Sequence, residues 1–383
     1  MEKWNRKTAI VTGASSGIGD AIVRDLVKYG INVVALARRM ERLETLRDHL
    51  KDEPGKVIPI KCDVSDKASI DAAFEQIEKE VGTVQILVNN AGICLTHGMF
   101  GDDDDKIDEI ISSTINTNFV ALFSFDGLII NMEKWSGKTA IVTGASAGIG
   151  DAIVRDLVKY GINVVALARR LERLESLKDQ LKDEKGKVIP IKCDVSDKAS
   201  IDTAFEEIEK QVGTVQILVN NAGIGQFYGI FGNNDDKTDE IISSTINTNF
   251  LGQVRVARKA YKLMKKSDDY GIIINIGSVT GHNASLDFLV NVYPGTKFAV
   301  RAVTESMRQE LNKLKDVKVR VCEISPGFVS TDLGGGSLKT PEIKAAFPML
   351  KSSDVAQTVQ FILMTPYEVN ITELIVKPVG EKM

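Results

Sequence analysis

The chain has 383 residues, with 48 Lys and Arg against 52 Asp and Glu, which gives a formal net charge of −4. No basic excess is left to hold a phosphate backbone, so we expect no nucleic-acid partner. The four cysteines and three histidines lack the paired spacing of a zinc site or a disulfide framework. No apolar run reaches the ~18 residues that a membrane span needs, and residues 1–13 carry no signal-peptide pattern. We therefore expect a cytoplasmic protein without a bound metal.

The chain contains a long internal repeat. Residues 1–119 match residues 132–250 with a constant offset of 131 and no gaps, and roughly 100 of these positions are identical. The match stops abruptly, and residues 120–131 form a short apolar junction without the turn residues of a linker. We interpret 1–119 as a truncated duplicate and 132–383 as the complete domain. A genuine tandem fusion and a wrongly joined gene model would both produce this pattern.

In the complete copy, strand-like apolar runs alternate with helical patterns. The expected strands are 139–143, 163–168, 187–192, 216–220, 271–277, 317–325 and 372–377. The expected helices are 149–160, 169–184, 198–212, one around 239–266 and one that begins at Tyr293. Because nearly continuous Val, Ile and Leu runs indicate strands buried on both faces, we predict an α/β fold with a Rossmann-type, doubly wound, seven-stranded parallel sheet. The truncated copy retains four strands, a half-sheet with an unpaired edge.

A glycine-rich turn follows the first strand of the complete copy and opens its first helix. Glycines at this place allow a tight turn and close backbone approach, so that a pyrophosphate can lie at the helix N-terminus. The residues of this turn that we expect to bind a cofactor are Gly144, Ser146, Ala147, Gly148, Ile149 and Gly150.

Two further groups extend the nucleotide site. Arg169 and Arg170 follow the second strand, where an acid would favour NAD and an arginine favours the 2′-phosphate of NADP; a solvent-facing pair is the alternative. Asp194 and Val195 follow the third strand, beside the expected adenine, although helix capping by residues 196–197 would also explain this neighbourhood.

The remaining motifs follow the fourth and fifth strands. Asn221, Ala222 and Gly223 end the fourth strand, at the edge where an open α/β sheet binds its ligand. Asn249 lies inside a helix, where asparagine is intrinsically unfavourable, and Ser278 follows the fifth strand.

Tyr293 and Lys297 are four residues apart and so share one face of a helix. An isolated tyrosine ionises near pH 10, and a neighbouring ammonium group favours the phenolate that a general base needs. Oxidised nicotinamide would add another positive charge, so we expect Lys297 and the cofactor to lower the pKa of Tyr293.

Together these motifs resemble the short-chain dehydrogenase/reductase family over the whole complete copy. The resemblance implies a catalytic set of Asn249, Ser278, Tyr293 and Lys297, of which Tyr293 and Lys297 also contact the cofactor. It adds cofactor contacts from Pro326, Gly327, Val329 and Thr331. It also implies a homodimer or homotetramer, unless the duplicate obstructs assembly.

The first residues of the complete copy, its VYPGTK segment and its C-terminal ITELIVKPVG resemble more narrowly the farnesol dehydrogenases of insects. This resemblance implies an NADP(H)-dependent oxidoreductase that interconverts an apolar alcohol, such as farnesol, and its carbonyl. The alternatives are a broad carbonyl reductase or hydroxysteroid dehydrogenase with the same residues, and a non-catalytic nucleotide-binding fusion.

The duplicate departs from this pattern. It retains Gly13, Gly17, Gly19, Arg38 and Asp63 of the cofactor half but has no serine, tyrosine and lysine set. We therefore expect that it cannot catalyse alone, and the sequence leaves open whether it folds or binds a cofactor.

Several loop residues of the complete copy carry weaker expectations. We expect His282 to line the mouth of the site and residues 332–350 to form a lid over the substrate. The apolar pocket would be lined by Phe347, Met349 and Leu350 of the lid and by Phe227 and Tyr228. We interpret the acidic run 102–105 as a solvated loop.

Overall fold

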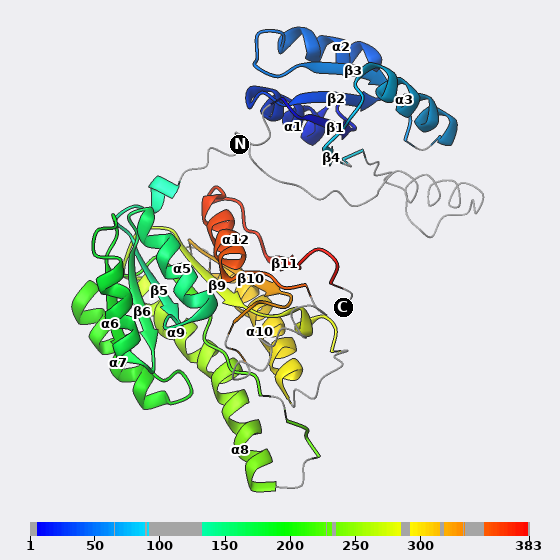
Figure 1. Ribbon diagram of the computed structural model, residues 1–383. Helices are drawn as coiled ribbons and strands as arrows, with labels where there is room; N and C mark the ends of the chain where they lie inside the picture. Colours follow the sequence, from blue (N-terminus) through cyan, green and yellow to red (C-terminus); the bar gives the residue numbers. More distant parts are fainter. Residues whose placement is uncertain are drawn as a thin grey trace. The chain divides into compact units, whose positions relative to one another are not determined.

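The computed structural model divides the chain into two compact units, residues 1–130 and 131–383 (Figure 1). Placement is described for residues 6–64, 66–88, 90–91, 132–226, 228–231, 235–284, 292–314, 318–331, 333 and 348–381. The junction 120–131 and the acidic run 102–105 lie outside these residues. Each unit is described by itself.

The second unit is built on a seven-stranded sheet with the strand order β11-β10-β9-β8-β5-β6-β7. Every pairing in this sheet is parallel, as the sequence predicts. The strands are β5 (Thr139–Thr143), β6 (Asn163–Ala168), β7 (Val188–Lys192), β8 (Ile217–Asn220), β9 (Gly271–Ile276), β10 (Val319–Pro326) and β11 (Glu373–Val376). The chain order reverses at β5, which pairs with β6 on one side and with β8 on the other.

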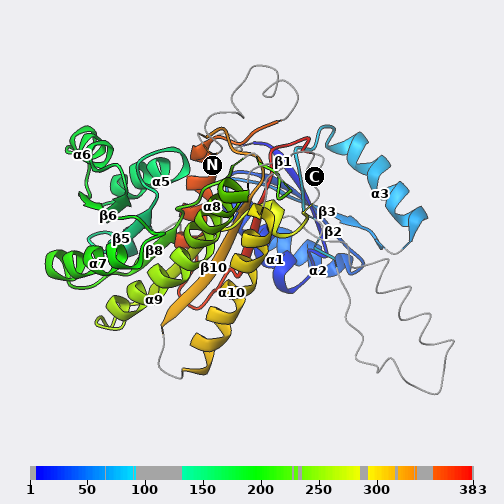
Figure 2. The same ribbon diagram turned by 90° about the horizontal axis from the view of Figure 1, so that it is seen from below.

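Helices cover both faces of this sheet (Figures 1 and 2). They are α5 (Gly148–Lys159), α6 (Leu171–Gln180), α7 (Lys198–Val212), α8 (Asp235–Ile246), α9 (Gln253–Met264), α10 (Tyr293–Lys313) and α12 (Ser352–Met364), with 3-10 turns at Met132–Trp135 and Val279–Gly281. Alternate strand residues enter two cores: Val142 packs with α5, α6 and α12, and Ile141 packs with α7 and α9. Burial on both faces is why the strands are apolar at nearly every position.

The helix expected around 239–266 is interrupted. A π-helical segment, Asn247–Gly252, lies between α8 and α9 and contains Asn249. Gly252 packs closely here, because a Cβ at this position would lie 2.5 Å from the carbonyl oxygen of Val195. The widened turn therefore coincides with a predicted site residue, and such bulges are frequent at functional sites.

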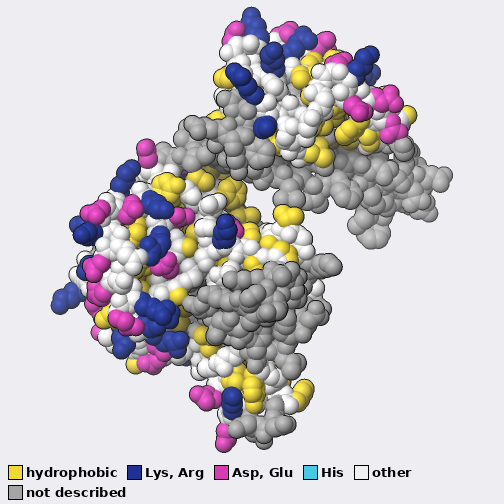
Figure 3. All heavy atoms as spheres, viewed as in Figure 1, with side chains coloured by type: hydrophobic (Ala, Val, Ile, Leu, Met, Phe, Trp, Pro, Cys, Tyr) yellow, Lys and Arg dark blue, Asp and Glu magenta, His cyan; other side chains and the backbone are white. Residues whose placement is uncertain are grey.

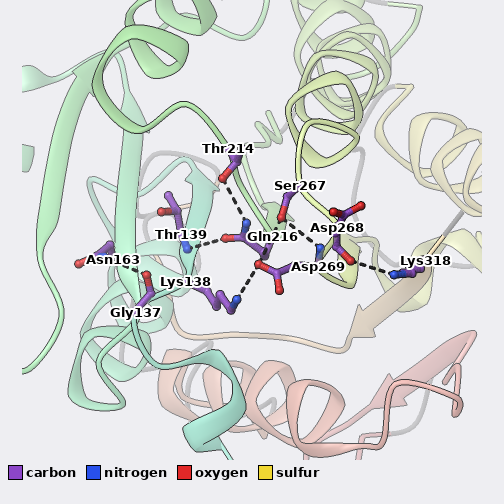
Figure 4. A network of polar contacts seen from close by, with 10 residues as sticks. All are labelled: Gly137, Lys138, Thr139, Asn163, Thr214, Gln216, Ser267, Asp268, Asp269 and Lys318. Carbon is purple, nitrogen blue, oxygen red and sulfur yellow. Dashed lines mark hydrogen bonds and ion pairs between the residues drawn. The ribbon is translucent and has the colours of Figure 1, made fainter.

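The amino-terminal ends of the strands are joined by polar contacts, seen in Figure 4. The Gln216 side chain accepts from the Thr139 amide at 3.0 Å and donates to the Thr214 hydroxyl at 3.4 Å. Lys138 pairs with Asp269 at 2.6 Å, which lowers the pKa of that carboxyl. Side-chain contacts thus hold the amino-terminal ends of the strands together. The candidate site lies at the opposite end, where the strands have their carboxyl ends.

The described part of the first unit repeats half of this architecture. Its parallel sheet has the order β3-β2-β1-β4, and three helices accompany it. The elements are β1 (Thr8–Thr12), α1 (Gly17–Lys28), β2 (Asn32–Ala37), α2 (Met40–His49), β3 (Val57–Lys61), α3 (Lys67–Glu80) and β4 (Ile86–Val88).

Matched positions in the two units differ in burial where later elements would cover them. Leu87 is 50% exposed and Phe74 is 47% exposed, whereas the matching Leu218 and Phe205 are 0% and 4% exposed. In the second unit, β9 pairs with β8 and α9 packs against α7, and both later elements contribute to the core around these two residues. The first unit therefore exposes apolar surface that its copy buries.

Acidic and basic side chains are interspersed over the face of the second unit in view in Figure 3. Among the described helices, none combines the length and the apolar character that crossing a membrane requires.

We predict that Gln216→Ala lowers the free energy of unfolding of the second unit by about 1–3 kcal/mol, because the Thr139 amide loses its acceptor at a place where the replaced side chain is itself buried from water. Proteolysis in a urea series, with mass spectrometry of the fragments, measures this for each unit. Gln85→Ala is the matched control, since Gln85 accepts from the Thr8 amide at 2.8 Å but is exposed. We expect a smaller effect in the first unit, and equal losses in both units would contradict the prediction.

Candidate active site

A cavity of about 570 Å³ opens at the carboxyl end of the sheet, beside the reversal point between β5 and β8. Open α/β sheets bind their ligands at this place. Its lining brings together nearly all of the predicted site residues: Gly144, Ser146, Ala147, Gly148, Ile149, Arg169, Arg170, Asp194, Val195, Asn221, Ala222, Gly223, Ser278, Tyr293, Lys297, Pro326, Gly327, Val329 and Thr331. Of the predicted residues, Gly150 and Asn249 do not line the cavity, but they support residues that do.

The glycine turn needs its glycines for two different reasons. Gly144 and Gly148 have φ values of +66° and +60°, a conformation that only glycine adopts readily. Gly150 has no such φ, but a Cβ there would lie 2.4 Å from the carbonyl oxygen of Gly144. The turn is therefore closed tightly by Gly150, and it presents the amino-terminal end of α5 to the cavity.

A group of hydrogen bonds, which we call the latch, joins this turn to the end of β8. The Thr143 hydroxyl accepts from the amides of Asn221 and Ala222, both at 2.9 Å, and the Asn221 side chain donates to the Thr143 carbonyl at 2.9 Å. Thr143 is 1% exposed. Sequence reasoning treated Asn221 as a cofactor contact and missed Thr143. The signal was available, because threonine stands at the end of the first strand in both copies.

The end of the cavity beside β6 and β7 is polar. Arg170 donates to the Ser146 hydroxyl at 2.9 Å, and both Arg169 and Arg170 are exposed. Asp194 accepts from the amide and the hydroxyl of Ser196 at 2.9 and 2.7 Å. Helix capping belongs to the neighbouring Asp197, which accepts from two amides at the start of α7. Asp197 therefore caps α7, and Asp194 lines the cavity.

Asn249 is fully buried, and its amide is engaged on both sides. Its oxygen accepts from the Ile224 amide at 2.8 Å, and its nitrogen donates to the Ile224 carbonyl at 2.8 Å and to the Thr296 hydroxyl at 3.3 Å. A Cβ at Gly223 would lie 3.5 Å from the Asn249 oxygen and 3.9 Å from the Lys297 ammonium. Asn249 therefore fixes the loop after β8 next to Lys297.

Ser278, Tyr293 and Lys297 meet at the base of the cavity. Ser278 begins the short turn after β9, and its oxygen lies 3.0 Å from the Thr280 hydroxyl. Tyr293 and Lys297 share one face of α10, with the ammonium nitrogen 5.6 Å from the centre of the tyrosine ring. Lys297 donates to the Ile276 carbonyl at 2.9 Å.

Burial governs the protonation of this pair. It raises the pKa of Tyr293 to about 12, while a hydrogen bond with Ser278 opposes the rise. It lowers the pKa of Lys297 to about 8, against the charge of Glu323, which raises it. Burial is thus the larger influence on the pKa of Tyr293 in this structure, and it acts against the lowering expected from Lys297 and oxidised nicotinamide, which stays a prediction.

The segment after β10 completes the lining. Thr331 lies over the glycine turn, since a Cβ at Gly148 would be 3.2 Å from its methyl carbon. Glu381, which the sequence reasoning missed, accepts from the Phe328 amide at 3.1 Å and lies where a Cβ at Gly327 would be. It comes from the C-terminal segment, and no local pattern links it to the turn.

Expectations for four loop residues differ from the structure, and others fall outside the described residues. Leu350 belongs to the hydrophobic core and pairs with Val329, so it does not line the substrate pocket. Tyr228 and Met349 are absent from the described lining of the cavity. His282 contacts Ser325 at 3.1 Å and Glu373 at 3.2 Å, behind the cavity instead of at its mouth. Phe227 and Phe347, with most of the expected lid, are not among the described residues.

Comparisons with known proteins show the family of this chain. The family model described as short chain dehydrogenase matches residues 7–135 and 138–341. The chain belongs to the short-chain dehydrogenase/reductase family. It is an oxidoreductase of that family, and the cavity at the carboxyl end of its sheet is the corresponding candidate active site.

The similar proteins match about two thirds of this chain over nearly their whole length. A farnesol dehydrogenase from Aedes aegypti is 43% identical over 253 residues, which are 66% of this chain and 100% of the relative. Dehydrogenase/reductase SDR family member 11 from Gallus gallus is 37% identical and covers 64% of this chain and 98% of its own. Among solved structures, an alcohol dehydrogenase from Thermococcus sibiricus complexed with 5-hydroxy-NADP matches with a TM-score of 0.56 at 29% identity, over 64% of this chain and 98% of its own.

We predict that Thr143→Val speeds hydrogen exchange of the Asn221 and Ala222 amides by about 10–100-fold, because the two donors lose their acceptor. Exchange followed by mass spectrometry measures this on the peptide that spans β8. Thr12→Val removes the same latch from the first unit, where Thr12 accepts from Asn90 and Ala91 at 2.9 Å. That control should leave the second unit unchanged, and unaltered protection in Thr143→Val would show that the latch is not structural.

Proposed function

We propose that the second unit is an NADP(H)-dependent oxidoreductase that interconverts an apolar alcohol and its carbonyl, with farnesol as the substrate. One observation carries the proposal: a single cavity joins Arg170 at one end to Ser278, Tyr293 and Lys297 at the other. We also propose that the enzyme is cytoplasmic. As the family resemblance implies, it works as a homodimer or homotetramer unless the duplicate obstructs assembly.

The residues present fit a dinucleotide. Gly144 and Gly148 of the glycine turn line the cavity, and Gly150 lets the turn close tightly, because a side chain there would meet the Gly144 carbonyl. Arg169 and Arg170 suit the 2′-phosphate of NADP, because a guanidinium group binds phosphate through charge-assisted hydrogen bonds. NADP, when bound, supplies the hydride acceptor in oxidation and the hydride donor in reduction.

The protein's own groups handle the proton and the oxygen atom of the substrate. In oxidation, Tyr293 as phenolate takes the hydroxyl proton, and Ser278 donates a hydrogen bond to the oxygen that becomes a carbonyl. Asn249 positions a water that passes the proton onward through Lys297. Because burial holds the pKa of Tyr293 near 12, the phenolate requires positive charge beside it, and the Lys297 ammonium, 5.6 Å from the centre of the tyrosine ring, can supply it.

Apolar side chains near Tyr293 support an apolar substrate. Ile224, Phe328 and Leu333 line the cavity, and a Cβ at Gly225 would lie 3.6 Å from the Tyr293 ring and 3.7 Å from Leu333. Gly225 therefore leaves space between the proposed base and an apolar wall. Similarity to a farnesol dehydrogenase supports a terpenoid alcohol as the substrate.

The first experiment follows absorbance at 340 nm with farnesol, and compares NADP with NAD on the full-length chain. Turnover that prefers NADP supports the proposal. Activity confined to ketones or steroids in a substrate panel would replace farnesol with the carbonyl-reductase or hydroxysteroid assignment. No turnover with any substrate would favour the non-catalytic fusion.

We predict that Tyr293→Phe lowers kcat by at least about 100-fold, because no general base remains to take the hydroxyl proton. NADP binding, measured by calorimetry, should persist because the nucleotide end of the cavity is untouched. A variant that turns over at the parental rate would eliminate Tyr293 as the base.

We predict that Arg170→Ala raises the KM for NADP by about 10–100-fold and leaves the KM for NAD unchanged, because only NADP carries the 2′-phosphate. Arg39→Ala is the matched control, since Arg39 in the first unit contacts Ser15 and Ser16 in the same way. An equal rise of the KM for NADP in the control would contradict a nucleotide site in the second unit.

A further inference from the structure

A buried carboxyl group lies behind the candidate active site. Glu323 is on β10, is 2% exposed, and occupies the space that a side chain at Gly277 would need, since a Cβ there would be 1.9 Å from its Oε1. Gly277 immediately precedes Ser278 and lines the cavity. The missing side chain at residue 277 thus lets a carboxyl group approach the catalytic residues from within the sheet.

A row of hydrogen-bonding groups connects this carboxyl group with the surface. The Ser325 hydroxyl donates to Glu323 Oε1 at 3.0 Å, and its oxygen lies 3.1 Å from His282 Nε2. The same ring nitrogen lies 3.2 Å from the Glu373 carboxylate, which also accepts from Arg301 at 3.0 Å. Ser325 is fully buried, while the side chains of His282 and Glu373 are 18% and 32% exposed. The row therefore runs from the buried interior to side chains that are partly exposed to solvent.

Two simpler explanations of this row are weaker. His282, Glu323 and Glu373 have ligand atoms within 4.8 Å of one another, but Arg301 already supplies a positive charge to Glu373. A purely structural carboxyl group would be costly, because a buried charge needs compensation. The compensating charge is Lys297, because its ammonium donates to the Ile276 carbonyl at 2.9 Å and Glu323 packs against the next residue, Gly277. Glu323 and Lys297 also act electrostatically on each other.

Lys297 needs such a partner. Its ammonium group is buried, its described hydrogen-bond acceptor is the neutral Ile276 carbonyl, and burial lowers its pKa to about 8. Among the described acids, Glu323 is the one whose charge opposes that shift. Without it, a buried lysine would tend to lose its proton near neutral pH.

We propose that Glu323 is a positioning residue whose negative charge keeps Lys297 protonated, and that Ser325 and His282 connect Glu323 to solvent so that its charge follows the pH. This inference rests on the proposed role of Lys297 beside Tyr293. Glu323 itself does not touch the substrate. Its effect reaches the reaction through the charge of Lys297.

Several charges decide the pH range in which this works. Lys297 and Arg301 on α10 favour the Glu323 carboxylate, Glu373 on β11 disfavours it, and burial raises its pKa to about 7. Burial also lowers the pKa of His282, which Glu373 raises and which Arg301 and Lys377 lower. A carboxyl group with a raised pKa loses its charge as the pH falls through about 7, and Lys297 loses its own as the pH rises through about 8. Both charges coexist between these limits.

The test uses the full chain without nucleotide and measures the reactivity of Lys297 toward acetic anhydride across pH by mass spectrometry. We expect Glu323→Gln to move the labelling midpoint of Lys297 down by about one pH unit, because an opposite charge is removed from a buried ammonium. Glu323→Asp should restore most of the parental midpoint. An unchanged midpoint in a folded Glu323→Gln protein would overturn the proposal.

Turnover gives a second measurement on the same variants. The alkaline limb of kcat should move to lower pH in Glu323→Gln. Ser325→Ala should instead move the acidic limb to higher pH, because the Ser325 hydroxyl lowers the pKa of Glu323. Ser325→Ala also keeps the proposal testable if Glu323→Gln does not fold, since identical profiles for it and the parent would overturn the link to solvent.

Failure of this inference can be distinguished from failure of the proposed function. A shifted labelling midpoint with no turnover of any alcohol would retain the charge coupling and discard the oxidoreductase assignment. Turnover that depends on Tyr293, with an unshifted midpoint, would do the reverse. Glu373→Gln, at the exposed end of the row, is the matched control and should move the Lys297 midpoint less than Glu323→Gln does.

Discussion

The arrangement of the site depends on one constraint, the meeting of β5 and β8 where the chain order of the sheet reverses. Connections from neighbouring strands leave in opposite directions at such a point, so the backbone opens there by topology alone. The latch between Thr143 and Asn221 keeps the opening in one shape by binding the glycine turn to the end of β8. The positions of the other cavity residues depend on this contact between β5 and β8.

Most of the fold could be predicted because its signals are local. A strand buried on both faces is apolar at each position, and a glycine turn between a strand and a helix has few alternatives. The π-helical segment at Asn249 could not be foreseen, because it depends on the approach of Gly252 to Val195, far away in sequence. The same holds for Leu350, whose place in the core is set by its pairing with Val329.

The sequence predicts which residues form the candidate site, but it does not predict the directions of their pKa shifts. Spacing places Tyr293 and Lys297 on one helix face, and strand ends place Ser278 beside them. The pKa directions depend on burial, which spacing does not report, and burial acts on Tyr293 against the direction expected from Lys297. Glu323 escaped notice because a carboxyl group inside an apolar strand carries no motif, and its meaning depends on the glycine opposite.

Residues that contact the later elements in the second unit are repeated in the first unit, and this has a consequence for folding. In the second unit, Lys138 and Glu209 bind Asp269 and Lys266, and the matching Lys7 and Glu78 keep the same chemistry in the first unit. Residues 253–381 therefore meet two similar templates as they emerge from the ribosome, and one of them has already been synthesised and exposed for longer. Proximity along the chain decides between them, because closing a loop of roughly 130 residues costs about 2–3 kcal/mol more than the direct connection. The entropy of loop closure therefore favours pairing of residues 253–381 with the contiguous copy, even where the matched contact residues are the same.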